Sequence, residues 1–116
     1  MSITVTVRVV LHKDDARTEP HPSNAKEYDT LHAEMHARGF SRFYDAKGGF
    51  RVKLPPGEYI VARDEHDGKK ARDAARDEAI DAATIATTAK RFSLLVTGGD
   101  SATSYRLERI TEDPDA

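Results

Sequence analysis

Aromatic and basic residues that could contact a nucleic acid are concentrated in the middle of this chain of 116 residues. Five of its eight aromatic residues fall between positions 40 and 59, in the set Phe40, Arg42, Phe43, Tyr44, Phe50, Arg51, Lys53 and Tyr59. Aromatic rings stack on bases, and arginine and lysine neutralise phosphates. The competing interpretation is that alternate aromatic residues enter the core while the charges solvate the outer face, and strand alternation by itself favours that interpretation.

Two histidines, His32 and His36, are four residues apart in a segment with helical spacing. Such a pair lies on one face of a helix, where imidazoles can share a metal ion or hold a proton near neutral pH. However, Glu34 follows the wrong histidine for the HExxH zinc signature, and no third ligand is evident nearby. Surface histidines without a special role are the favoured interpretation, so we predict no metal site and no cofactor.

A second group of polar residues, His12, Asp14, Asp15 and His21, lies in or beside the segment 12–23. An acid pair near the end of a strand can hold a divalent cation or position a water molecule. Runs of charge are also common in exposed loops, and that interpretation is favoured here. No phosphate loop and no nucleophile motif is present, because no Lys-Ser/Thr follows Gly98 and Gly99 and no elbow surrounds a serine.

The composition indicates one small domain and excludes several classes of chemistry. The chain has no cysteine, so disulfides, thiolate metal sites and a cysteine nucleophile are excluded. A net charge of -2 gives no global attraction to nucleic acid. The start of the chain has no export pattern and no long apolar run follows, so we expect a cytoplasmic protein without a membrane partner. With few aromatic residues and many alanines, a second copy would help to cover the core, as in a homodimer.

The first half of the chain predicts a strand, a long loop and a helix. Residues 3–11 alternate between apolar and polar, which is typical of a strand with one buried face. Residues 12–23 carry charges and two prolines and read as an exposed loop. A helix is expected over 25–38, with Asn24 as its N-cap and Gly39 at its C-terminal end.

The second half predicts a hairpin, a helix and two further strands. Residues 40–45 and 50–54 flank a glycine turn and form the hairpin. Pro55, Pro56 and Gly57 then interrupt the pattern, and 58–63 is either a kinked continuation or a separate edge strand. An alanine-rich helix is expected over 67–88, followed by strands over 92–97 and 103–110.

These elements predict an α+β fold with the order β-α-β-β-α-β, a ferredoxin-like sandwich in which two helices cover one face of an antiparallel sheet. The other sheet face is then open to a partner. Residues 1–110 are expected to form this single domain, and residues 111–116 a flexible acidic tail.

Beyond this pattern of elements, three stretches of the chain resemble a known protein family. They are Tyr28-Asp-Thr-Leu-His-Ala-Glu-Met-His-Ala-Arg-Gly-Phe-Ser-Arg, Leu54-Pro-Pro-Gly-Glu-Tyr and Phe92-Ser-Leu-Leu-Val-Thr. The chain resembles, over most of residues 1–110, the GhoS-like family of type V toxin–antitoxin antitoxins. The resemblance implies a ferredoxin-like fold similar to the CRISPR-associated Cas2 nucleases, and an endoribonuclease activity directed at the messenger RNA of a membrane toxin.

The resemblance also suggests residue roles, with His32 for proton transfer and Arg42 for phosphate stabilisation as the catalytic candidates. The candidate RNA-binding residues are Arg38, Tyr44, Arg51 and Lys53. The loop 12–23 departs from the short connection of the family.

Three functions stay open at this point. The first is a metal-independent or Mg²⁺-assisted endoribonuclease, and the second is RNA binding without cleavage. The third is a non-enzymatic protein-interaction module, such as a phage-type or mobile-element inhibitor (anti-CRISPR-like), which uses an open sheet face or edge.

Overall fold

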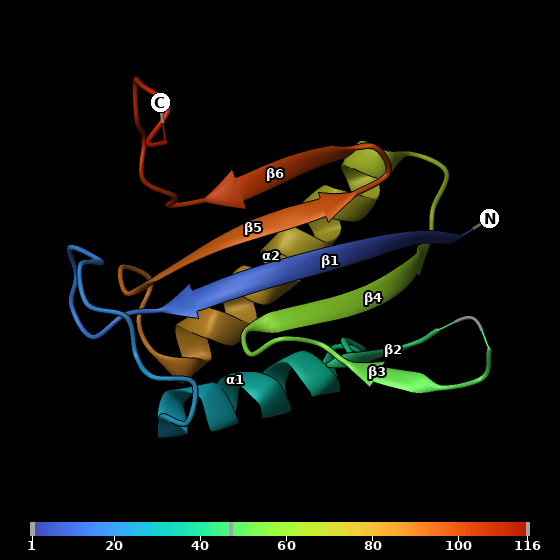
Figure 1. Cartoon of the computed structure of the whole chain (residues 1–116), viewed down its shortest axis with the longest axis horizontal. Helices are drawn as coiled ribbons and strands as arrows, with labels where there is room; N and C mark the ends of the chain where they lie inside the picture. The colour runs from blue at the N-terminus through green and yellow to red at the C-terminus, as the bar shows by residue number, and fades with distance from the viewer. Residues whose placement is uncertain (1, 47, 116) are drawn as a thin grey trace.

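The computed structural model describes residues 2–46 and 48–115, which contain six strands and two helices (Figure 1). In chain order the elements are β1 (Ser2–Leu11), α1 (Lys26–Ala37), β2 (Phe43–Asp45), β3 (Arg51–Lys53), β4 (Glu58–Asp64), α2 (Gly68–Ala86), β5 (Phe92–Gly98) and β6 (Ser101–Tyr105). Four strands form an antiparallel sheet in the order β4-β1-β5-β6, and β2 and β3 form a separate two-stranded sheet. The predicted α+β class is confirmed.

β1 lies inside the sheet because one of its faces is a row of aliphatic side chains. These are Val5, Val7, Val9 and Leu11, each no more than 1% exposed. Val7 lies opposite Tyr59 of β4 and Val96 of β5, so the row continues across both neighbouring strands. α2 crosses this face of the sheet in Figure 1 and closes the core over it. The alternation predicted for residues 3–11 is confirmed.

Both helices contribute one buried stripe to this core. α2 buries small side chains, Ala71, Ala75, Ala79, Ala82 and Ala83, which let its backbone approach the sheet closely. α1 buries Tyr28, Leu31 and Met35, as their spacing predicts. The predicted cap at Asn24 is wrong: α1 has Ala25 as its N-cap, without a side-chain hydrogen bond. Gly39 follows the helix with φ +91°, as expected at its C-terminal end.

The predicted element order is wrong in the middle and at the end of the chain. The hairpin forms over β2 and β3, but it stands apart from the main sheet. Of the two alternatives for residues 58–63, the separate edge strand is confirmed, because β4 lies at the edge of the main sheet and pairs with β1. Proline has no N–H to donate to a ladder, and Gly57 turns the chain with φ +82°, so β3 cannot run on into β4. β6 adds an edge strand and ends at Tyr105, before the predicted 110.

The loop 12–23 is folded back on itself by one carboxylate. Asp14 accepts hydrogen bonds from the backbone N–H groups of Thr18 and Glu19, each at 3.0 Å. The N–H of Lys13 donates to the carbonyl of Glu19 at 2.7 Å, and His12 forms a bridge with Pro20. This loop therefore has a defined shape despite its length and its charge.

Neither helix in the described part of the chain has the length and apolar character that are needed to cross a bilayer.

Candidate functional site

A groove between α1 and the β2–β3 hairpin brings half of the predicted site residues together. It encloses about 590 Å³, and Tyr59 of β4 contributes to its wall. Its lining residues are His32, Ala33, His36, Phe40, Arg42, Phe43, Lys53 and Tyr59. This lining combines apolar and aromatic side chains with four nitrogen-bearing ones and contains no carboxylate.

The secondary structure explains why these residues meet. His32 and His36 are one helical turn apart on α1. Phe43 and Lys53 are paired across the hairpin, so their side chains stand on the same face of it. Ser41 bridges to Ile60, which ties the chain before the hairpin to β4.

His32 is oriented by a hydrogen bond to a buried phenol. Its Nδ1 lies 2.7 Å from the hydroxyl of Tyr59, and Tyr59 is only 1% exposed. Burial raises the pKa of Tyr59, so its hydroxyl keeps its proton. A protonated phenol can donate to Nδ1 or accept from Nδ1–H, so the same geometry suits two tautomers of His32. In the tautomer in which Nδ1 accepts, the hydrogen lies on Nε2, and His32 offers an N–H to a ligand in the groove.

The charge state of His32 fits this donor role. Burial lowers its pKa, and the nearby Arg42 guanidinium lowers it further. The ring is therefore neutral near pH 7. With its hydrogen on Nε2 the ring donates to an anion, and with its hydrogen on Nδ1 it has an Nε2 lone pair that can act as a general base.

Arg42 and Lys53 supply the positive charge of the groove. Neither side chain forms an ion pair with a described carboxylate, and both are exposed. After burial, the Arg42 guanidinium and, more weakly, the Lys53 ammonium lower the pKa of His32, whereas the Asp29 carboxylate raises it. An anionic ligand in the groove would meet two cations and the His32 N–H.

The other three predicted residues are placed elsewhere. Arg38 is paired with Glu34, with Nη1 2.9 Å from both the Glu34 carbonyl and its carboxylate. Arg51 donates to Asp45 at 2.9 Å and lies 4.1 Å above the Phe43 ring. Tyr44 is paired with Val52, so it stands on the opposite face of the hairpin from Lys53. None of the three lines the groove.

Sequence reasoning missed the role of Tyr59 as the partner of His32. The two residues are 27 positions apart. In the sequence, Tyr59 is only one of several aromatic residues in its region, shortly after Pro55 and Pro56. The single signal available was its place within an alternating strand, which predicts burial but not a partner. His36 also lines the groove, although its pattern favoured an exposed residue without a role.

The loop carboxylates considered as a cation site are occupied by protein partners. A hydrogen bond from the Thr18 hydroxyl lowers the pKa of Asp14, and one from Arg91, at 2.8 Å, lowers that of Asp15. Across residues 2–46 and 48–115, no three side chains of His, Asp or Glu are grouped as a metal ion would need.

Acidification is expected to destabilise the fold through His12 and His32. Burial lowers the pKa of both below the ordinary value of 6.5, so the unfolded chain takes up protons first. The free energy of unfolding should then fall as the pH drops through 6.5 and level off below the two folded-state pKa values. Urea unfolding at pH values above and below this range measures the change in the free energy of unfolding.

The matched variants for this prediction are His32→Gln and His36→Gln. The first removes a partly buried titrating ring, and the second replaces an exposed ring on the same helix. We expect the first variant to lose part of the pH dependence and the second to keep it. The same pH dependence in both variants would contradict a contribution from His32.

Comparisons of the chain with protein-family models, with curated proteins and with solved structures give no match.

Proposed function

We propose that this protein binds single-stranded RNA in the groove between α1 and the hairpin, and that it acts as an antitoxin-like RNA-binding regulator. The observation that carries the proposal is the meeting of Arg42, Lys53 and His32 around one hollow whose lining contains no carboxylate. Phosphates would contact these groups, and a base would contact the apolar surface beside Phe43. The resemblance of the chain to GhoS-like antitoxins supports RNA as the ligand.

The fold supports this proposal through a ferredoxin-like arrangement. Without the detached hairpin and the edge strand β6, the order is β1, α1, the segment at Ser41, β4, α2 and β5. That order is β-α-β-β-α-β when the single bridge between Ser41 and Ile60 is counted as the second strand. We infer that the hairpin is an insertion that builds one wall of the groove.

Binding without cleavage is the form of the proposal that the site supports best. We infer the tautomer in which Tyr59 donates to Nδ1 and His32 presents Nε2–H to the groove; its lowered pKa leaves the ring uncharged, so it is not a proton donor of the imidazolium type. His32 therefore contributes a hydrogen bond to a phosphate or to a ribose hydroxyl. Recognition, and not turnover, would be the activity of this groove.

The test is an RNA-binding titration with a fluorescent single-stranded oligonucleotide, followed by electrophoresis of the same RNA. We expect saturable binding that weakens with salt, and intact RNA both with and without EDTA. The His32→Ala variant should bind about 2- to 10-fold more weakly, as for the loss of one hydrogen bond.

The outcomes separate the alternatives. RNA cleavage that His32→Ala abolishes would replace this proposal with an endoribonuclease. Absence of binding at low salt would contradict it outright. A DNA oligonucleotide of the same sequence serves as the control, since equal affinity for both would remove the preference for RNA.

A second candidate function rests on the open face of the sheet. Leu95 of β5 is 37% exposed there and lies opposite Arg8 of β1, on the side that the helices leave free. An apolar side chain on an open sheet face suits a protein partner, as in a non-enzymatic inhibitor of the phage or mobile-element type. Recovery of one stoichiometric protein from host lysate, lost in Leu95→Asp, would favour this function.

A further inference from the structure

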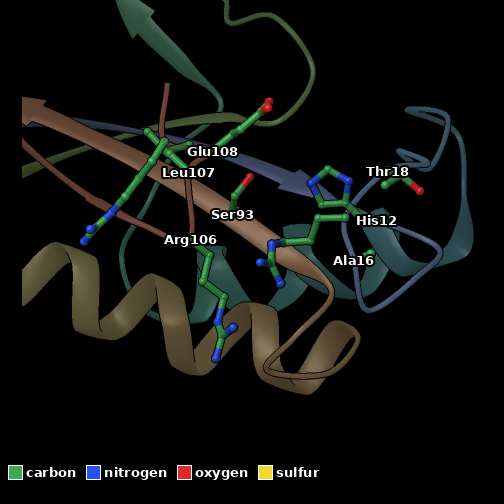
Figure 2. Close-up of a pocket in the computed structure, with 9 residues that line it drawn as sticks. His12, Ala16, Thr18, Ser93, Arg106, Leu107 and Glu108 are labelled. Carbon is green, nitrogen blue, oxygen red and sulfur yellow. The ribbon is translucent and has the colours of Figure 1, made fainter. Parts of the chain in front are cut away.

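A second hollow lies between the loop after β1 and the segment after β6, away from the RNA groove. It encloses about 620 Å³ and shares no lining residue with that groove. In Figure 2, His12 and Thr18 lie on the side of the loop, Leu107 and Glu108 lie on the C-terminal segment, and Ser93 of β5 lies between them. Residues from three distant parts of the sequence therefore meet around it.

His12 contributes a buried nitrogen with no partner. The residue is only 9% exposed, and its Nδ1 makes no hydrogen bond within the described residues. Its position is fixed, because its backbone N–H donates to the carbonyl of Arg91 at 2.7 Å. Buried polar atoms are rarely left unsatisfied, so this nitrogen needs a partner beyond the described side chains, either a water molecule or a ligand atom.

Three guanidinium groups give the hollow a positive charge. Arg17, Arg106 and Arg109 line it, against the one carboxylate of Glu108. Arg17 donates to the carbonyls of Lys90 and Asp15, at 2.8 and 3.1 Å, which fixes its side chain without neutralising it. Arg106 and Arg109 form no ion pair with any described carboxylate.

The backbone presents two of these arginines in an unusual conformation. Arg17 and Arg106 both have φ +58°, a left-handed conformation that costs energy for any residue with a Cβ. The described chain has three such non-glycine residues, and two of them line this hollow. Backbone strain of this kind is concentrated at ligand-binding sites, where it helps to place a side chain.

We propose that this hollow, the Arg106 pocket, binds a phosphomonoester group. A phosphomonoester presents three terminal oxygens and close to two negative charges, which suits guanidinium groups on both rims. The hydroxyl of the buried Ser93 and the imidazole of His12 are further polar partners on the floor. The group can belong to a small phosphate compound or to the terminus of an RNA strand, and both share this chemistry.

The test begins with inorganic phosphate as the probe, at constant ionic strength. We expect saturable binding by calorimetry and a shift of the His12 ring nitrogens by NMR. The double variant Arg106→Gln/Arg109→Gln should bind phosphate at least about tenfold more weakly, because two charge-assisted contacts are lost. Both residues are exposed, so the fold should be retained.

Arg8→Gln is the matched control, because it removes one exposed arginine on the outer face of β1. Phosphate affinity should be unchanged in this variant. The NMR shift of His12 reports on this pocket and not on the RNA groove, so a failure of the RNA proposal leaves this result intact.

The source of the phosphate is separated by two further probes, adenosine monophosphate and a pair of oligonucleotides with 5′-phosphate or 5′-hydroxyl ends. Tighter binding of the phosphorylated strand, lost in Arg106→Gln/Arg109→Gln, assigns the pocket to an RNA terminus. Binding of phosphate or the nucleotide without that difference assigns it to a small phosphate compound. No saturable binding of any probe at millimolar concentration, or an equal loss in Arg8→Gln, would overturn the proposal.

Discussion

Replacing Arg42 and Lys53 together with glutamine is expected to weaken the binding of single-stranded RNA by about 10- to 100-fold. The two side chains line the groove without a carboxylate partner, so their charges are available to phosphates. Each lost phosphate contact should also reduce the slope of log affinity against log salt by about 0.7. Fluorescence anisotropy at several salt concentrations measures both quantities.

The matched control for this prediction is Arg51→Gln. Arg51 lies on the same hairpin, but it is paired with Asp45 and stacked on Phe43. Its charge is already compensated, so we expect a change in RNA affinity of less than about threefold. An equal loss in the control and in the double variant would show that RNA responds to the overall charge of the hairpin rather than to the groove.

The variant Gly57→Ala is expected to lower the free energy of unfolding by about 2–5 kcal/mol. Gly57 has φ +82°, and a Cβ placed there would lie 2.7 Å from the carbonyl oxygen of Val9. The backbones cannot separate easily, because the N–H of Val9 donates to the carbonyl of Gly57 at 2.8 Å. Val9 is part of the core, so any adjustment would spread into β1.

Gly49→Ala separates the effect of conformation from the effect of contact. Gly49 has φ +85°, close to that of Gly57, but nothing lies within 4 Å of a Cβ placed there. We expect this variant to lose only about 1–2 kcal/mol, the cost of the left-handed conformation. Urea unfolding of both variants measures the difference, and equal losses would contradict the importance of the contact with Val9.

The main elements could be predicted because they depend on local patterns. Alternation over residues 3–11 and the alanine stripe of α2 each specify a buried face, and both faces are buried in the structure. The glycine turn also predicted the β2–β3 hairpin. In each case neighbouring residues carry the whole signal, so no knowledge of distant contacts was needed.

The candidate site was only partly predictable from the same patterns. His32, Arg42 and Lys53 were selected by residue type, and the structure brings them to one groove. Arg38 and Arg51 were selected on the same grounds, yet each is engaged by a nearby carboxylate. A charged residue type indicates what a side chain can bind. Whether the side chain is available to a ligand depends on whether a nearby carboxylate already pairs with it.

The sequence by itself determined the α+β class, both helices and the buried faces of the strands, because burial of apolar surface follows local periodicity. Only the tertiary structure decided which strands pair, that the hairpin stands apart, and that Tyr59 orients His32. The tertiary structure also places His12 and Arg106 around a second hollow. These contacts link residues far apart in the chain, and their geometry follows from packing the whole core.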